Sequence, residues 1–165
     1  MKKSKYTCIL LILMLFPSFT GADVDVYFSP RGYCEAAIIC QITSSQSTID
    51  IAMYSFTSEP IAGALVDARN RGVFIRVLLD TQQAGSRYSR VDYLDENGIE
   101  VRVEDWSGYM HHKFAVIDSS TLIVGSYNWT ANAEESNNEN LLIIRDDSLS
   151  MVFLDEFQGM WDRVD

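Results

Sequence analysis

The chain has 165 residues, 47% of them hydrophobic, which is enough to bury the core of one domain of ordinary size. Its 13 basic and 23 acidic residues give a net charge of −10, which excludes a general positive surface of the kind on which nonspecific nucleic-acid binding normally rests. A local basic groove is still compatible with this total, because net charge does not fix the local field.

The first 22 residues have the pattern of a secretory signal peptide. A basic start is followed by an apolar run over residues 6–16, which is too short to span a bilayer, and by a small, turn-prone stretch that ends at Ala22. Cleavage there removes three lysines and leaves residues 23–165 as a single domain. The style of the leader favours export to a bacterial periplasm, with secretion from the cell as the alternative.

The rest of the chain alternates apolar strands with helices. Strands are expected over 24–28, 48–54, 73–79, 99–103, 114–117, 122–124 and 141–144, and helices over 34–45, 59–70, 91–96 and 149–161. Ser58 and Pro60 mark the start of the second helix and Gly72 its end. This alternation predicts an α/β fold with a mixed, mostly parallel sheet flanked by helices on both faces.

Two cysteines, Cys34 and Cys40, remain after removal of the leader, an even pair in an oxidising compartment. If both lie in one regular helix, they are about 9 Å apart along its axis, too far to bond. A disulfide requires that Cys34 precede the helix. The sequence leaves open whether the pair is bonded or forms two buried thiols.

The segment from His111 to Asn128 carries the residues best suited to chemistry. It reads His-x-Lys, four residues, Asp, six residues, Gly-Ser-x-Asn, and its apolar runs predict a β-hairpin. Because residues two apart on a strand share a face, His111 and Lys113 point the same way. Ser126 and Asn128 fall together just past the second strand. The four side chains are therefore expected to line one pocket.

Such a pocket suits phosphoryl transfer, which needs positive charge at the non-bridging oxygens, a nucleophile in line and an acid for the leaving oxygen. Lys113 supplies a cation, and Ser126 and Asn128 supply neutral donors. His111 can attack or protonate near neutral pH. Asp118 is too far along the strand to share this face, so we expect a structural role for it.

Simpler interpretations apply to each residue taken alone. A lone His-x-Lys at a strand end is usually a solvated edge, and only the combined spacing indicates catalysis. His112 lies on the opposite face and is expected to pack rather than attack. Asn128-Trp129-Thr130 also fits a glycosylation acceptor, but an asparagine in a catalytic pocket could not carry a glycan and work.

These residues resemble the HKD signature of the phospholipase D superfamily, carried here by His111, Lys113 and Asp118 with Gly125, Ser126 and Asn128. The likeness extends to residues 26–30, 52–58 and 138–142. It is greatest to the small secreted endonucleases of bacteria and to the mitochondrial phospholipase-D-like nuclease. The resemblance implies a phospholipase D-like fold with one motif per chain.

The resemblance also implies a two-step mechanism without metal or other cofactor. One histidine forms a phosphohistidine, a histidine from a second motif protonates the leaving group, and water releases the product. This chain has only two histidines, which are adjacent, so a complete site is expected to need a homodimer that shares it. Glu139 corresponds to the acidic residue that hydrogen-bonds the histidine in the family; otherwise it is a solvated charge near Glu134 and Glu135.

Substrate contacts are predicted outside the motif. Arg87 and Arg90, in the loop over residues 80–90, are candidates for a phosphate-contacting arm, and an ordinary surface loop is equally compatible with the pattern. The aromatic residues near the motif could stack bases or, as we slightly prefer, pack at a dimer seam; they are Trp106, Tyr109, Tyr127 and Trp129. Of these, Trp129 is the candidate substrate contact.

Three functions are compatible with the sequence. The favoured one is an exported, nonspecific endonuclease. The second is a phospholipase D that converts phosphatidylcholine to phosphatidate, although no apolar lid is evident. The third is a nucleic-acid-binding module with a dead site, which is disfavoured because no motif residue is missing. Strand preference, and DNA against RNA, leave no mark in the sequence.

Overall fold

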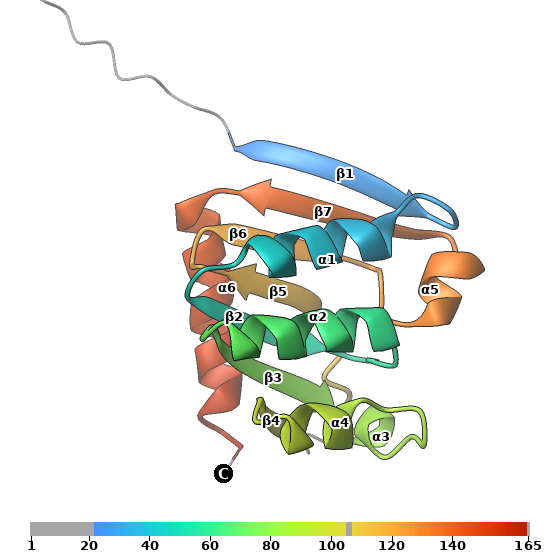
Figure 1. Ribbon diagram of the computed structural model, residues 1–165, viewed down its shortest axis with the longest axis vertical. Coiled ribbons are helices and arrows are strands. Elements are labelled where there is room, and N and C mark those ends of the chain that lie inside the picture. The colour runs from blue at the N-terminus through green and yellow to red at the C-terminus, as the bar shows by residue number, and fades with distance from the viewer. Residues whose placement is uncertain (1–21, 105–106, 165) are drawn as a thin grey trace, which may run out of the picture.

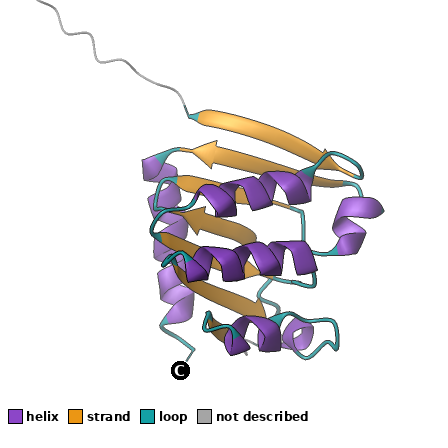
Figure 2. Ribbon diagram, in the orientation of Figure 1, coloured by secondary structure: helices purple, strands orange, loops and turns teal. Residues whose placement is uncertain are grey.

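One seven-stranded sheet runs through the computed structural model, which describes residues 22–104 and 107–164 (Figures 1 and 2). Its strands are β1 (Asp23–Ser29), β2 (Thr48–Met53), β3 (Phe74–Asp80), β4 (Glu100–Glu104), β5 (Lys113–Ile117), β6 (Thr121–Gly125) and β7 (Glu139–Arg145). Their order is β1-β7-β6-β5-β2-β3-β4. The helices are α1 (Cys34–Ser44), α2 (Glu59–Asn70), α3 (Thr81–Ala84), α4 (Val91–Glu96), α5 (Ala131–Glu135) and α6 (Asp147–Trp161).

The sheet is mixed, and its parallel part is smaller than predicted. Only the pairs β2–β3 and β3–β4 are parallel, and the remaining four pairs are antiparallel. A short turn joins β5 to β6 and thereby forces an antiparallel pair, whereas the helical crossover through α2 allows β2 and β3 to run parallel. The α/β class with a mixed sheet between helices is confirmed.

Strand alternation builds two cores, one on each face of the sheet. Ile49 and Ile51 of β2 face α1 and α2, whereas Ala52 of the same strand faces α6. Figure 1 shows α1, α2 and α4 in front of the sheet and α6 behind it. The sequence predicted this arrangement because both faces of the central strands are apolar.

The predicted helices agree with the structure where sequence signals were strong. The predicted bounds of α2 are those observed, and the Ser58 hydroxyl accepts a hydrogen bond from the backbone nitrogen of Ile61 at 3.2 Å. Helices α3 and α5 were not predicted, because four or five residues are too few to show a hydrophobic period. The predicted leader lies almost wholly outside the described residues.

The cysteines lie together in α1 as free thiols, so the structure contains no Cys34–Cys40 disulfide. Cys34 is buried with Ile38 and Ile42, four and eight residues on, along the face of α1 that meets the sheet. Cys40 falls off this face and is exposed, so the alternative of two buried thiols was wrong for Cys40. None of the helices within residues 22–104 and 107–164 is long and apolar enough to cross a membrane.

Candidate active site

Except for Asp118, the motif residues lie at one end of the sheet, toward which the arrowhead of β3 points in Figure 1. Lys113 is the first residue of β5 and pairs with Met53, the last residue of β2. Ser126 directly follows β6, and Glu139 is the first residue of β7. Antiparallel pairing therefore collects residues from distant parts of the chain, as the hairpin predicted for His111 to Asn128.

Tyr54 is the side chain on which His111 and Lys113 converge. Its ring centroid lies 4.4 Å from that of His111 and 4.9 Å from the Lys113 Nζ, which also donates to the His111 carbonyl at 2.8 Å. The Tyr54 backbone nitrogen donates to the His112 carbonyl at 2.8 Å. Tyr54 was not predicted as a site residue, although it lies in the stretch 52–58 that carried part of the family likeness.

The environment of His111 favours its neutral form. Partial burial lowers the pKa of its imidazole, and the nearby Lys113 ammonium lowers it further, against an opposing effect of Asp80. An ordinary histidine titrates at about 6.5. The imidazole is therefore mostly unprotonated at neutral pH, the form that a nucleophile needs.

Lys113 is half-buried beside this imidazole. Burial lowers the pKa of its ammonium group, and the Glu139 carboxylate opposes that change. A partly desolvated cation interacts more strongly with a nearby anion than a fully hydrated one. Lys113 is thus placed to hold a phosphate at His111.

Glu139 is held by two side chains of its own chain. Ser126 Oγ donates to its Oε2 at 2.5 Å, and Asn137 Nδ2 donates to its Oε1 at 3.1 Å. Ser126 Oγ also accepts from the Asn140 backbone nitrogen at 3.1 Å. Among the described residues, Glu139 has no hydrogen bond to His111 of the same chain, so the contact implied by the family resemblance is not made within one subunit.

Gly125 allows Ser126 to reach this position. A Cβ atom on Gly125 would lie 2.2 Å from the carbonyl oxygen of Asn140, a distance that no side chain tolerates. The glycine of the Gly-Ser-x-Asn motif is therefore required by the close approach of β6 and β7. We expect a larger residue here to push β6 and β7 apart and so to weaken the hydrogen bond between Ser126 and Glu139.

Asn128 is half-buried at the rim of the same site. Its Oδ1 accepts a hydrogen bond from the Ser55 backbone nitrogen at 3.3 Å. This bond fixes the amide orientation and leaves Nδ2 as the group that can donate to a ligand. Asn128 can thus serve as the neutral phosphate donor predicted from the sequence.

Asp118 lies at the far end of β5 and has the structural role that we predicted. Its carboxylate accepts hydrogen bonds from the backbone nitrogens of Gln46, Ser47 and Thr48 at 2.9, 2.8 and 3.0 Å, and from Ser47 Oγ at 2.8 Å. Burial acts to raise the pKa of Asp118, but these hydrogen bonds outweigh it and hold the pKa below its usual value. The carboxylate ties the β5–β6 turn to the α1–β2 connection.

Replacing Asp118 with alanine is expected to lower the free energy of unfolding by about 1–2 kcal/mol, because four donors lose an ionised acceptor. A depressed carboxyl pKa contributes stability above its unfolded value near 3.9, and this contribution is lost as pH falls through the lower folded value. Urea unfolding at pH 7 and at pH 3 measures both effects. A variant as stable as wild type at pH 7 would contradict the anchoring role.

The prediction that Trp129 contacts the substrate was wrong. Its side chain is only 1% exposed and packs edge-on against Phe56, with ring centroids 5.1 Å apart. Tyr127 is also buried, and its hydroxyl donates to Glu134 at 2.9 Å. Neither ring can stack on a base or pack at a dimer seam. Loop residues were expected at the surface, but the backbone bridge between Phe56 and Trp129 turns this side chain into the core.

The other predicted contacts differ in exposure. Arg90 donates to the Thr57 carbonyl at 3.0 Å and pairs with Glu59 at 2.8 Å, so its charge is largely used within the chain. Arg87 is exposed, with its guanidinium 4.4 Å from the Tyr88 ring centroid. Tyr109 is exposed and meets the Tyr54 ring edge-on, and Trp106 lies outside the described residues.

His112 points to the α6 side of the sheet, opposite to His111, but its side chain is exposed rather than packed in the core as predicted. Its ring lies edge-on to that of Phe114, with centroids 5.5 Å apart. Over residues 22–104 and 107–164, no three His, Cys, Asp or Glu side chains gather closely enough to hold a metal ion. The described site therefore consists of His111, Lys113, Tyr54, Ser126, Asn128 and Glu139.

Residues 38–161 match the protein family described as "Cardiolipin synthase, PLD-like domain". The chain belongs to the phospholipase D superfamily. Its predicted membership is thus confirmed, and it carries the residues of a superfamily phosphodiesterase.

Relatives in the phospholipase D superfamily agree with this assignment. Mitochondrial cardiolipin hydrolase of Mus musculus is 36% identical, over 98% of this chain and 74% of the relative. The human protein of the same name is 37% identical, over 74% of this chain and 48% of its own length. The chain therefore spans between about half and three quarters of these relatives.

Solved structures of superfamily members cover nearly the whole domain. Nuc from Salmonella typhimurium, a phospholipase D family member, aligns with a TM-score of 0.83 at 31% identity, over 88% of this chain and 97% of that one. NucT from Helicobacter pylori aligns with a TM-score of 0.79 at 28% identity, over 87% and 98%. The phospholipase D-like fold predicted from the motif is confirmed.

Proposed function

We propose that this chain is a nonspecific endonuclease that hydrolyses nucleic-acid phosphodiesters through a phosphohistidine, without a metal ion. The observation that carries the proposal is the convergence of His111 and Lys113 on Tyr54 at the open end of the sheet. The nearly full-length match to Nuc supports a nuclease. The strongly acidic total charge is compatible with an anionic substrate, because Lys113 supplies positive charge at the catalytic end of the sheet.

The chemistry follows from the chain's own groups. The neutral imidazole of His111 attacks phosphorus while Lys113 and Asn128 hold the non-bridging oxygens. The bond from phosphorus to the leaving oxygen breaks, and that oxygen takes a proton from the imidazolium of a second subunit's His111. Water then gives its proton to that imidazole, attacks phosphorus and releases His111 as the phosphorus–nitrogen bond breaks.

Lys113 gives a direct test of the electrostatic part of this mechanism. Lys113→Met is expected to lower kcat/KM by about 100-fold, roughly 3 kcal/mol, because the developing charge on phosphate loses its cation. The acidic limb of the pH profile should also move to higher pH, since the ammonium that lowers the pKa of His111 is gone. Lys113→Arg is the matched variant and should keep the limb near its original position.

A homodimer with a shared site is part of the proposal, because each chain has a single motif and the reaction uses two imidazoles. In this proposal a second copy docks on the α6 face of the sheet. Helix α6 contacts β2, β5 and β6, whereas Val24, Val26 and Phe28 of β1 are 43%, 52% and 65% exposed. The β1 edge of this face therefore lacks a covering helix among the described residues.

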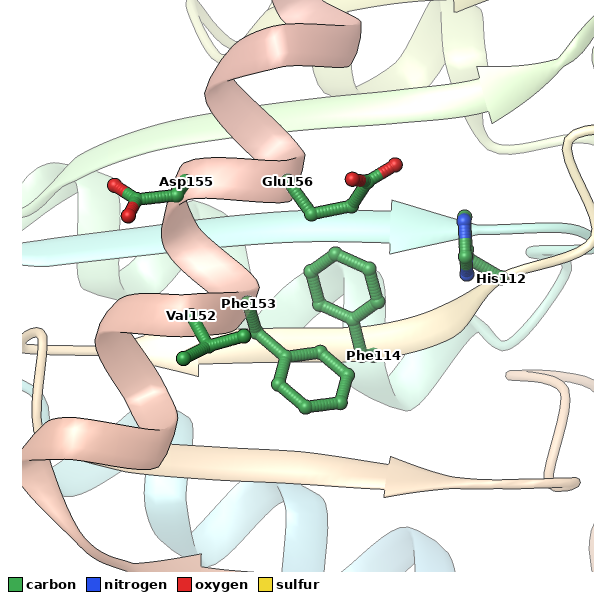
Figure 3. A pocket seen from close by; sticks show the side chains of 6 residues that line it. All are labelled: His112, Phe114, Val152, Phe153, Asp155 and Glu156. Carbon is green, nitrogen blue, oxygen red and sulfur yellow. The ribbon is translucent and has the colours of Figure 1, made fainter.

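A groove of about 500 Å³ runs beside α6 on this face. Figure 3 shows the rings of Phe114 and Phe153 packed together in it, with Val152 on α6 next to them and His112 at one end. Val152 is 62% exposed. In the proposed dimer the α6 helix of a second copy lies against this groove and covers the exposed β1 edge. Because His112 adjoins His111, the two motifs then lie near the two-fold axis.

Substrate assays distinguish the nuclease from its main alternative. Two relatives carry the names cardiolipin hydrolase and phospholipase D, the latter 33% identical in Rickettsia bellii, so phospholipid head-group hydrolysis is the second candidate. Purified protein is incubated in EDTA with plasmid, single-stranded DNA and phosphatidylcholine vesicles. We expect chelator-resistant cleavage of nucleic acid. Release of choline beside intact DNA would overturn the nuclease proposal, and no hydrolysis at all would indicate a binding module.

We also propose export through the N-terminal leader. The support is the sequence pattern of residues 1–22, with a basic start and a short apolar run. N-terminal sequencing of the protein from a periplasmic or culture fraction should begin at Asp23. Recovery only from the cytoplasm with Met1 in place would contradict export.

A further inference from the structure

A second hollow, of about 610 Å³, opens directly beside the catalytic residues. Tyr54 and Asn128 line both the hollow and the site. Asn137, another lining residue, donates to the Glu139 carboxylate at 3.1 Å. A ligand whose phosphate lies at His111 would therefore extend its neighbouring group into this hollow.

The lining of the hollow is polar but carries little free charge. Gln83, Asn132 and Asn137 present side-chain amides, each with donor and acceptor atoms. The cation that the described lining contains, Arg90, is paired with Glu59 at 2.8 Å and bonded to the Thr57 carbonyl. A surface that tracks a phosphate backbone needs unpaired positive charge, which the described residues of this lining do not supply.

Tyr88 adds an aromatic surface to the same hollow. Its side chain is 57% exposed, and the Arg87 guanidinium lies 4.4 Å from its ring centroid. The opposite face of the ring is suited to stacking on a planar ligand. Gln83 Nε2 donates to the Tyr54 hydroxyl at 3.3 Å, which links this arm to the catalytic end of the sheet.

We propose that this hollow binds a nucleobase of a single-stranded nucleic acid while the adjoining phosphate lies at His111 and Lys113. The inference rests on the proposed nuclease function and names its substrate class. Amide groups match the mixed donors and acceptors on base edges, and stacking on Tyr88 tolerates any base. A base within a duplex cannot enter the hollow without leaving its stack, so single strands are preferred.

The test uses fluorescent oligonucleotides of one sequence as single-stranded DNA, single-stranded RNA and DNA duplex. Binding is measured on the His111→Ala protein, and cleavage on the protein with His111 intact. Either single strand should bind at least tenfold more tightly than the duplex. Tyr88→Ala should weaken single-strand binding and raise KM by about tenfold, whereas Tyr88→Phe retains stacking and binding.

Tyr93→Ala is the matched control, since Tyr93 is 41% exposed on the neighbouring helix α4 and lines a different hollow. It should leave single-strand binding and KM unchanged. Equal binding of single strand and duplex, with Tyr88→Ala no weaker than Tyr93→Ala, would overturn the nucleobase site while leaving the nuclease intact. Choline release without nucleic-acid cleavage would instead remove the proposed function itself.

Discussion

Replacing His111 with alanine is expected to lower kcat/KM for nucleic acid by at least about 1,000-fold. Of the described groups that contact Tyr54, the imidazole is the one suited to form the phosphoryl bond. Its loss leaves Lys113 and Asn128 to bind substrate without a nucleophile. Because the side chain is exposed, the free energy of unfolding should change little. Steady-state cleavage assays and urea unfolding on the same preparation measure the two quantities.

Dimers that combine a wild-type and a His111→Ala subunit test whether two chains share one site. If each site uses one imidazole from each of two chains, a dimer with one His111→Ala subunit is inactive. Activity should then fall with the square of the wild-type fraction, so an equal co-expressed mixture retains about a quarter of the rate rather than half. A linear decline would show that each chain works alone, and the shared site would be wrong.

Val152→Asp is expected to convert the dimer to a monomer and to lower nuclease activity by more than about 100-fold. Asp155 and Glu156 already line the groove beside Phe114 and Phe153, so a further carboxylate would be desolvated by a second α6 helix and repelled by these two, which opposes assembly. Since Val152 is 62% exposed in the single chain, the variant should fold normally. Sedimentation velocity and cleavage assays at matched concentrations measure assembly and activity.

The control for this change is Tyr93→Asp, which adds the same charge to an exposed side chain on α4, on the opposite side of the sheet from α6. It should remain dimeric and active. A monomeric Val152→Asp protein with full activity would refute the shared site. A dimeric and active one would place the interface elsewhere.

Local signals predicted the parts of the fold that depend on neighbours in sequence. The β5–β6 hairpin and α2 follow from strand alternation and from the cap at Ser58. The antiparallel pairing of β1 with β7 could not be predicted in this way, because it joins residues more than a hundred positions apart. For that reason the parallel share of the sheet was overestimated.

The site residues also fall into those that local sequence predicts and those that depend on long-range contacts. His111, Lys113, Ser126 and Asn128 share a short segment, so periodicity alone placed them together. Tyr54 enters through the pairing of β2 with β5, a long-range contact without a local signal. The burial of Trp129 depends on its packing against Phe56, another contact that no local period could reveal.

The hydrogen bonds of Asp118 explain why the lysine and the aspartate of the HKD signature are a fixed number of residues apart. Asp118, at one end of β5, is hydrogen-bonded to the backbone around Ser47, and Lys113 lies at the other end. The four residues between them therefore set a fixed distance from the anchor to the site. Inserting or deleting one residue between them would move the side chains beyond that point to the opposite face of the sheet. After such a change, either Asp118 could keep its hydrogen bonds or Lys113 could keep its position at the phosphate, but not both. The number of residues between them is therefore as necessary as their identity.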